Sequence, residues 1–212
     1  MAETDTSGDA AHWEAVYGAR TETALTWYEA EAALSLDLIK THAALDAAII
    51  DVGGGASRLV DGLIAAGFDD ITVLDLSNAA LETSRRRIGE KSGDVTWHAV
   101  DIREWQPPRA FDLWHDRAVF HFLTRDADRA AYLHRAQGAI APGGVAIIMS
   151  FALDGPEMCS GLPVQRYSPE TLRDEIDRHA PGAFDLIDQR AHTHVTPMGR
   201  EQRFQVSVFR RR

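Results

Sequence analysis

Residues 49–58 (IIDVGGGASR) constrain the fold more than any other part of the sequence. An apolar run ends in Asp51, and Gly53, Gly54 and Gly55 follow before a helical pattern begins. This order is typical of a buried strand that turns sharply into a helix in an α/β sheet. Glycines at such a turn let backbone N–H groups approach an anionic or polar ligand at the start of the helix. The segment therefore predicts an α/β protein with a nucleotide-like ligand beside this turn.

Short apolar runs alternate with helical patterns along most of the sequence. Strands are predicted at residues 47–52, 71–74, 95–100, 111–114 and 145–151, and helices at 11–18, 29–45, 58–66, 78–88 and 169–179. Two more strand-like segments, 184–195 and 202–210, flank a turn and form a hairpin. This alternation implies a parallel sheet with right-handed crossovers. We therefore expect an α/β fold with a doubly wound, seven-stranded, mostly parallel sheet, helices on both faces and a C-terminal antiparallel hairpin.

Length and composition limit how the chain is organised. At 212 residues and 45% hydrophobic composition, the chain can bury one full core, so residues 1–212 are expected to form a single domain. Within it we expect a helical lead-in at 1–45, a ligand-binding core at 46–151, and a substrate loop with the closing hairpin at 152–212. The net charge of −10 argues against a nucleic-acid partner, because binding phosphates needs a basic face.

The sequence carries no membrane or secretion signal. No stretch approaches the ~20 apolar residues that cross a bilayer, and the acidic, polar residues 1–9 lack the basic-then-apolar order of a signal peptide. The single cysteine, Cys159, rules out an internal disulfide framework and a multi-cysteine zinc site. We therefore expect a cytoplasmic protein that needs neither a membrane nor a metal.

The glycine turn fits neither common phosphate-binding fingerprint. A G-x-G-x-x-G motif starting at Gly53 would place its third glycine at Arg58, and the G-K-[ST] tripeptide of a P-loop does not occur. The turn alone is also compatible with a tight strand–helix connection that binds nothing.

Two further acids favour a ligand site. Asp75 ends the second predicted strand, 20 residues beyond Gly55, where a carboxylate can accept hydrogen bonds from a ribose diol. Asp101 ends the third, where a carboxylate can accept from the exocyclic amine of a base while Ile102 supplies an apolar surface. Each acid alone is equally well a helix cap or a loop residue. Together they place acids at three successive strand ends, on the edge where open α/β sheets bind ligands.

In these motifs the chain resembles the class I S-adenosylmethionine-dependent methyltransferases. The matching residues are 51–55 (DVGGG), 73–77 (VLDLS), 99–102 (AVDI) and 111–114 (FDLW), within a resemblance that covers roughly residues 47–151. The resemblance implies a Rossmann-like methyltransferase fold that uses S-adenosyl-L-methionine and releases S-adenosyl-L-homocysteine. It implies these cofactor residues: Asp51, Gly53, Gly54, Gly55, Asp75, Leu76, Asp101, Ile102 and Asp116.

The roles follow from the same resemblance. The backbone of Gly53–Gly55 would lie under the methionine part of the cofactor, Asp75 would take the ribose hydroxyls, and Asp101 would take the adenine amine. The third glycine often seen in this loop is replaced here by Ser57.

The N-terminal aromatic residues carry a narrower resemblance. His12, Trp13, Tyr17, Trp27 and Tyr28 are similar to the lead-in of small methyltransferases, among them thiol, thiopurine and halide methyltransferases and lysine methyltransferases acting on citrate synthase or elongation factor. In such proteins this segment lies over the cofactor and helps to shape the substrate pocket. We therefore expect Trp27 and Tyr28 to contact substrate; the alternative is that these aromatics only pack the N-terminal helices on the sheet.

Further substrate residues should come from the loops after the fourth and fifth strands. Residues 115–122 (HDRAVFHF) are not the Asn/Asp-Pro-Pro-Tyr signature of amino-methylating nucleic-acid enzymes. Asp116 would orient the sulfonium region or the nucleophile, or else cap the next helix. His121 would act as a general base near neutral pH, or else be a structural residue between two phenylalanines. Arg166, in the loop after the fifth strand, is a further substrate candidate.

The expected activity is methyl transfer to a small-molecule acceptor, either a thiol or other chalcogen or an amine. The alternatives are a protein lysine methyltransferase, a non-catalytic cofactor-binding protein, and a nicotinamide-dependent reductase, which Arg58 and the closing hairpin disfavour. Methyl transfer from a sulfonium is an in-line displacement, which depends on positioning and water exclusion. The sequence is therefore not expected to contain an obvious catalytic dyad.

Overall fold

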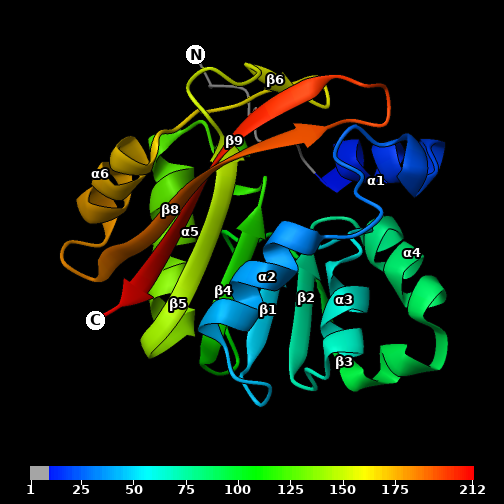
Figure 1. The fold of residues 1–212 in the computed structure, drawn as a ribbon, viewed down its shortest axis with the longest axis horizontal. Helices are drawn as coiled ribbons and strands as arrows, with labels where there is room; N and C mark the ends of the chain where they lie inside the picture. Colours follow the sequence, from blue (N-terminus) through cyan, green and yellow to red (C-terminus); the bar gives the residue numbers. More distant parts are fainter. Residues whose placement is uncertain (1–9) are drawn as a thin grey trace.

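One twisted, seven-stranded sheet forms the centre of the molecule (Figure 1). A computed structural model describes residues 10–212; residues 1–9, which the sequence marks as an acidic polar segment, lie outside the described part. The strand order is β3-β2-β1-β4-β5-β9-β8, with the first five strands parallel and β9 inserted antiparallel between β5 and β8. The strands are β1 (Ile49–Val52), β2 (Ile71–Asp75), β3 (Val95–Ala99), β4 (Phe111–Arg117), β5 (Ile140–Phe151), β8 (Phe184–Val195) and β9 (Glu201–Arg211).

The order of the strands places a ligand crevice between β1 and β4. From β1 the chain runs outward to β2 and β3 and then returns to β4 on the other side of β1. Open α/β sheets bind ligands at such a reversal, beyond the carboxyl ends of the strands. The observed sheet confirms the expected doubly wound, mostly parallel architecture with its C-terminal hairpin.

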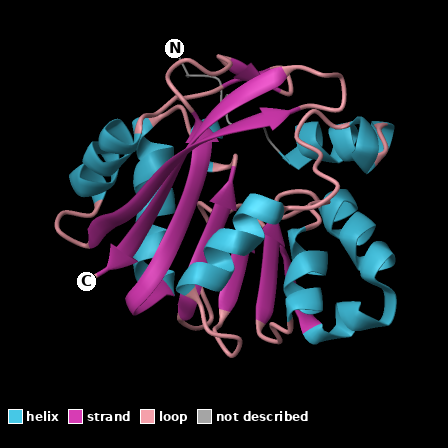
Figure 2. Cartoon of the chain, viewed as in Figure 1, coloured by secondary structure: helices cyan, strands magenta, loops and turns pink. Residues whose placement is uncertain are grey.

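Helices cover both faces of the sheet (Figure 2). Buried side chains of α2, α3 and α4 share one apolar cluster with the sheet, and those of α5 and α6 share the other. In β1 the side chains alternate between the clusters, with Ile49 in the first and Ile50 in the second, as the period of a strand requires. The helices are α1 (Ala10–Ala19), α2 (Ala33–His42), α3 (Leu59–Ala66), α4 (Asn78–Ile88), α5 (Asp126–Ala139) and α6 (Pro169–His179), with single 3₁₀ turns η1 (Glu22–Ala24), η2 (Gly89–Asp94) and η3 (Phe120–Phe122).

Local sequence signals explain where several helices begin and end. The Ser77 side chain accepts a hydrogen bond from the backbone N–H of Ala80 and so caps α4. Gly67 ends α3 in the left-handed conformation, with φ of 93°. Ser168 and Thr171 form a capping box at the start of α6.

Three elements differ from the sequence-based expectation. The helix expected over 29–45 is shorter, since α2 covers Ala33–His42. Strand β4 runs three residues further than expected, to Arg117, because its polar residues find buried partners. The expected turn at 141–144 is absorbed as an irregularity in β5: Phe111 pairs with Ile140, whereas Leu113 already pairs with Val145.

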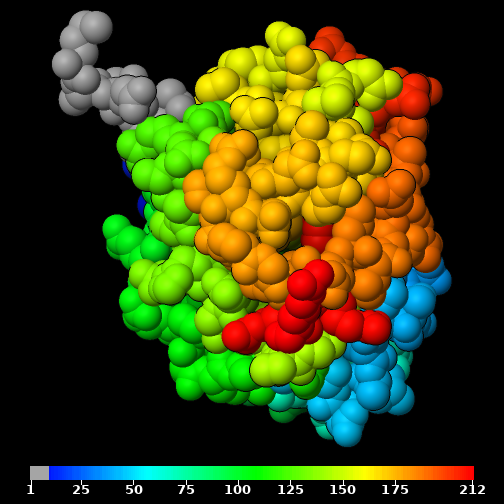
Figure 3. Space-filling model, turned by 90° about the vertical axis from the view of Figure 1, so that its left-hand side faces the viewer, coloured from blue at the N-terminus to red at the C-terminus, as the bar shows by residue number. Residues whose placement is uncertain are grey.

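The C-terminal part closes the far edge of the sheet. The loop after β5 contains the short hairpin β6 (Met158–Cys159) and β7 (Leu162–Pro163). Figure 3 faces the side that carries α6, where α6 and the end of β9 lie next to each other at the surface. Within residues 10–212, no helix has the length and apolar character needed to span a membrane.

Candidate active site

A cavity lies beyond the carboxyl ends of β1, β2 and β4. It contains about 840 Å³ of empty space when the solvent at its mouth is included. The cavity is lined by residues from the N-terminal segment, the three strand ends and the loops that follow them: Trp13, Tyr17, Trp27, Val52, Gly53, Leu74, Asp75, Leu76, Val100, Asp101, Ile102, Arg103, Arg117, Ala118, Val119, Phe122, Leu123 and Cys159.

The glycines of the first loop are required by close contacts. A Cβ on Gly53 would lie 2.0 Å from Val119 Cγ2, and one on Gly54 would lie 2.5 Å from Asp51 Oδ2. Gly53 and Gly55 also have positive φ angles of 70° and 38°. A side chain at Gly53 would therefore displace Val119 of the cavity wall, and one at Gly54 would displace the buried Asp51 behind the loop.

Asp75 brings a buried carboxylate to the cavity. Its Oδ1 accepts a hydrogen bond from the backbone N–H of Ser77 at 2.8 Å. Its Oδ2 faces the glycine loop, since a Cβ on Gly55 would lie 2.6 Å from Oδ2 and 3.2 Å from the Tyr17 hydroxyl. Burial, together with the nearby charges of Asp51 and Glu14, raises the pKa of Asp75 to about 7. Donors from a ligand would therefore stabilise the ionised form of this group.

Asp101 lines the cavity but already carries a partner. The Arg103 guanidinium donates to both of its carboxylate oxygens, with Nε at 3.0 and 2.9 Å and Nη2 at 2.5 Å. The backbone N–H of Arg103 also donates to Oδ1, at 2.8 Å. Arg103 also bonds Asp128 of α5 at 3.2 Å. The arginine thus fixes the orientation of the Asp101 carboxylate at the edge of the cavity.

Asp51 lies behind the glycine loop in a fully buried polar chain. Its Oδ1 lies 2.7 Å from His115 Nδ1, and His115 Nε2 lies 2.9 Å from Ser35 Oγ of α2. All three side chains are buried and none lines the cavity, so this Asp-His-Ser arrangement is closed to substrates. Asp51 is therefore placed to hold the loop, because its Oδ2 contacts the Gly54 position.

Aromatic side chains of the N-terminal segment form one wall of the cavity. Trp27 makes edge-to-face contacts with Trp13 and Tyr17 at ring-centroid distances of 5.9 and 6.0 Å. Trp13 also packs edge-to-face on Phe122 at 5.1 Å. Tyr28 does not line the main cavity; it lines a smaller one beside it, where Arg58 lies 5.8 Å above its ring.

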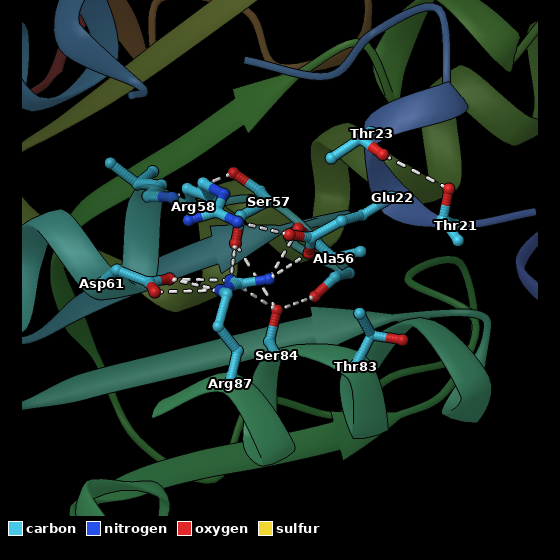
Figure 4. Close-up of polar contacts among 12 residues, drawn as sticks. Thr21, Glu22, Thr23, Ala56, Ser57, Arg58, Asp61, Thr83, Ser84 and Arg87 are labelled. Atoms are coloured by element: carbon cyan, nitrogen blue, oxygen red, sulfur yellow. Dashed lines mark hydrogen bonds and ion pairs between the residues drawn. The ribbon is translucent and has the colours of Figure 1, made fainter. Parts of the chain in front are cut away.

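Ion pairs hold this N-terminal segment against the glycine loop (Figure 4). Glu22 of η1 pairs with Arg58 at 2.5 Å and with Arg87 of α4 at 2.6 Å. Arg87 also pairs with Asp61 at 2.7 Å and donates to the backbone oxygen of Ser57 at 2.6 Å. We call Glu22, Arg58, Asp61 and Arg87 the clasp.

A second attachment comes from α1. Glu14 accepts hydrogen bonds from the backbone N–H groups of Asn78 and Ala79, the nearest at 2.6 Å, and so satisfies the first turn of α4. The N-terminal segment is therefore attached to the start of α3 through Arg58, and to α4 through Arg87, Asn78 and Ala79.

The two residues expected to act in catalysis lie outside the cavity lining. Asp116 is fully buried: its carboxylate accepts from the backbone N–H groups of Val119 and Phe120 and from the Tyr132 hydroxyl at 2.5 Å. This geometry matches the capping alternative. His121 is also fully buried, and burial next to the Arg117 charge lowers its pKa to about 3, so the ring is neutral. That environment matches the structural alternative for His121.

Arg166 lies away from the cavity. It donates to the backbone oxygen of Gly155 at 3.1 Å and pairs with Glu157 at 2.9 Å, both in its own loop. Cys159 does line the cavity, and burial raises the pKa of its thiol to about 12, so it stays protonated at neutral pH.

Within residues 10–212, three potential metal ligands converge only between α5 and α6. Asp126, Glu175 and His179 approach one another there, and none of the three lines the cavity. Arg129 and Arg178 already pair with both carboxylates, at 2.6 to 3.6 Å. This cluster is therefore an ion-pair network that joins the two helices.

The sequence-based reasoning missed four residues that shape the site. Glu14 and Glu22 lie in the N-terminal segment and act on partners more than 30 residues away, so no local pattern reveals them. His115 and Arg117 lie in the part of β4 that was not expected to be strand. If the fourth strand had been predicted to continue to residue 117, the rule that ligands bind at the carboxyl ends of strands would have singled out Arg117.

Comparison with known proteins identifies the domain. A family model described as a methyltransferase domain matches residues 50–146. A mouse (Mus musculus) eEF1A lysine and N-terminal methyltransferase is 24% identical over 122 residues, which is 57% of this chain but only 17% of the relative.

Solved structures share the fold over most of the chain. A structure from work on the conversion of a disulfide bond into a thioacetal group in echinomycin biosynthesis has a TM-score of 0.72 and 20% identity, covering 95% of this chain and 92% of its own. The Burkholderia thailandensis 1,6-didemethyltoxoflavin-N1-methyltransferase, with its acceptor and S-adenosylhomocysteine bound, has a TM-score of 0.68 and 22% identity, covering 86% and 79%. At these identities the likeness establishes the fold.

The family match, the strand order and the motifs agree. Residues 50–146 match a methyltransferase domain, and the strand order of the sheet is that of the methyltransferase structures it resembles.

Proposed function

We propose that the protein transfers the methyl group of S-adenosylmethionine to a small-molecule thiol, other chalcogen or amine. The observation that carries this proposal is a single cavity whose lining joins strand-end acids to an aromatic wall. Asp75 and Asp101 lie on its β2–β3 side, and Trp13, Tyr17 and Trp27 come from the N-terminal segment. A cofactor and a small acceptor would thus lie in one space.

The residues present fit the cofactor. We assign the ribose diol to Asp75, whose Oδ2 faces the glycine loop, and the adenine amine to Asp101, with Leu76 and Ile102 as apolar neighbours. We assign the methionine part to the Gly53–Gly55 loop, held from behind by Asp51. When bound, S-adenosylmethionine supplies an electrophilic methyl group on a sulfonium.

The chain itself supplies positioning and water exclusion. The clasp and Glu14 hold residues 10–30 over the cavity, and the edge-to-face aromatic rings keep that wall apolar. Holding a nucleophile in line with the methyl group inside a water-poor space can account for most of the rate enhancement. In this proposal residues 10–45 close the site, residues 46–151 hold the cofactor, and residues 152–212 complete the acceptor side.

A second candidate is a protein lysine methyltransferase. It is supported by the 24% identity to the mouse eEF1A lysine and N-terminal methyltransferase, and by the net charge of −10, which would suit a basic peptide. The thioacetal and toxoflavin structures, which match most of the chain, support the small-molecule proposal instead.

Two measurements test the proposal. Calorimetry with S-adenosylmethionine, S-adenosylhomocysteine and NAD should show binding of the two sulfur nucleosides and none of NAD; absence of sulfur-nucleoside binding would contradict it. A tritiated-methyl transfer screen over thiols, amines and cell-extract proteins should then place the label in the small-molecule fraction. Label in a protein band would favour the lysine methyltransferase instead.

A further inference from the structure

Arg117 places a buried guanidinium in the cavity wall. It is the last residue of β4, and its side chain is 14% exposed. In the parallel pairing of β1 with β4, Val52 lies opposite Asp116, so Arg117 follows at the level of the glycine loop. The side chain therefore lies near the loop assigned to the methionine part and away from Asp101, at the opposite limit of the cofactor site.

The guanidinium is only partly satisfied by the protein. Its Nη1 donates to the backbone oxygen of Trp27 at 3.1 Å, and its Nη2 lies 3.0 Å from Glu29 Oε1 as an ion pair. Among residues 10–212, however, neither Nε nor Nη2 has a partner in hydrogen-bond geometry, and both atoms are buried. The Glu29 charge compensates Nη2, whereas a buried donor without any partner, such as Nε, is costly, so an arriving acceptor group would be favoured at Nε.

The ion pair of Arg117 with Glu29 belongs to a small polar cluster. Glu29 Oε1 lies 3.4 Å from His194 Nδ1 and 4.0 Å from His192 Nε2, so Arg117 and two histidines share one carboxylate. Although burial alone would raise the pKa of Glu29, the His194 hydrogen bond and the Arg117 charge lower it, so the acid is ionised. Arg117 is thus held beside an ionised carboxylate that it shares with two imidazole rings.

We propose that Arg117 selects an acceptor bearing a carboxylate, so that the substrate is a small thiol or amine acid. The proposal rests on the function proposed above and adds the chemical class of the acceptor. A guanidinium offers two parallel N–H donors that match the two oxygens of a carboxylate. A lysine ammonium acts as a point charge and lacks this match. Trp27, Ala118 and Cys159 give this part of the cavity an otherwise weakly polar wall, so a charged ligand group would find Arg117 as its partner.

The test compares probe pairs that differ only in the carboxylate. Protein saturated with S-adenosylhomocysteine is titrated calorimetrically with aniline against 4-aminobenzoate, and with phenylmethanethiol against 4-(mercaptomethyl)benzoate. We expect the acid of each pair to bind at least about tenfold more tightly, because a charged hydrogen bond is involved. Arg117→Met should remove that preference, Arg117→Lys should retain part of it, and neither should change the affinity for S-adenosylhomocysteine. Arg190→Met, which removes an exposed arginine of β8, is the control and should behave as wild type.

Several results would contradict the role proposed for Arg117. Equal affinity within both pairs, failure of all four probes to bind, or an unchanged preference in Arg117→Met would overturn the proposal. Loss of S-adenosylhomocysteine affinity in a folded Arg117→Met protein would reassign Arg117 to the cofactor's own carboxylate and also overturn it. The methyl-transfer screen is judged separately from the binding test. If the acids bind more tightly but the label appears only in protein bands, the small-molecule function is overturned and the role of Arg117 is not.

Discussion

Asp75→Asn should affect folding and cofactor binding in opposite directions. Burial raises the pKa of Asp75 from 3.8 to about 7, so the folded protein holds an acid that resists ionisation. Above pH 7 that difference corresponds to an upper limit of about 4 kcal/mol of destabilisation. An amide avoids this cost and still offers Oδ1 to the N–H of Ser77. The ligand-free variant should therefore be more stable than wild type at pH 8.

The stability difference between Asp75→Asn and wild type should depend on pH. Between pH 4 and 7 the unfolded carboxyl is ionised while the folded one keeps its proton, so wild-type stability falls as pH rises through this window and then levels off. The advantage of Asp75→Asn should accordingly be largest above pH 7 and shrink towards pH 4. Urea unfolding at several pH values measures it. Asp69→Asn, a change at an exposed acid, should show no such trend.

Cofactor binding should respond the other way. If Asp75 accepts hydrogen bonds from the ribose hydroxyls, its replacement loses about 1.5–3 kcal/mol, or about a 10- to 150-fold weaker Kd for S-adenosylhomocysteine. Binding should also release a proton below about pH 7, because the ionised carboxylate is the better acceptor. Calorimetry in two buffers of different ionisation enthalpy measures that proton. An unchanged Kd, or an equal proton release in wild type and variant, would refute the assignment.

Three further outcomes follow from the contacts of the site. Glu22→Gln removes the carboxylate that pairs with both Arg58 and Arg87 in the clasp. S-adenosylhomocysteine should then dissociate several-fold faster, as measured by stopped-flow tryptophan fluorescence. An unchanged rate would show that the clasp does not govern cofactor exchange. His121→Phe should leave the pH profile of kcat/KM unaltered, since a ring with pKa about 3 outside the cavity lining does not titrate near neutrality; loss of a limb of the profile would restore His121 as a base. Tyr132→Phe withdraws a buried donor from Asp116 and should lower the free energy of unfolding by about 1–3 kcal/mol in urea; an unaffected midpoint would mean that the bond contributes little.

The sequence predicts the sheet well because its signals are local. The apolar runs, the cap at Ser77 and the glycine at 67 each act within a few residues, and α3 and α4 lie close to the expected ranges. Strand β4 shows where such reasoning stops. A buried strand that contains His115 and Asp116 looks polar, and only distant partners, Asp51 and Tyr132, make its burial possible.

The same limit applies to the site. Asp75, Leu76, Asp101, Ile102 and Trp27 all line the cavity. They were selected by the carboxyl-edge rule and the aromatic pattern, which can be read along the chain. Asp116 and His121 were selected for their chemistry and for their place after the fourth predicted strand. Such residues in a buried strand or turn are as readily structural, and both side chains are fully buried here.

The cavity is polarised along its length, and this matters for the reaction. The assigned nucleoside part meets carboxylates, which accept hydrogen bonds from hydroxyl and amine donors, whereas Arg117 gives the acceptor part a cation. Reversing a bound acceptor would take its carboxylate away from Arg117 and lose that charged hydrogen bond. In a protein of net charge −10, a guanidinium held by Glu29 and Trp27 therefore provides both attraction and a fixed direction of binding, which is the orientation that an in-line displacement requires.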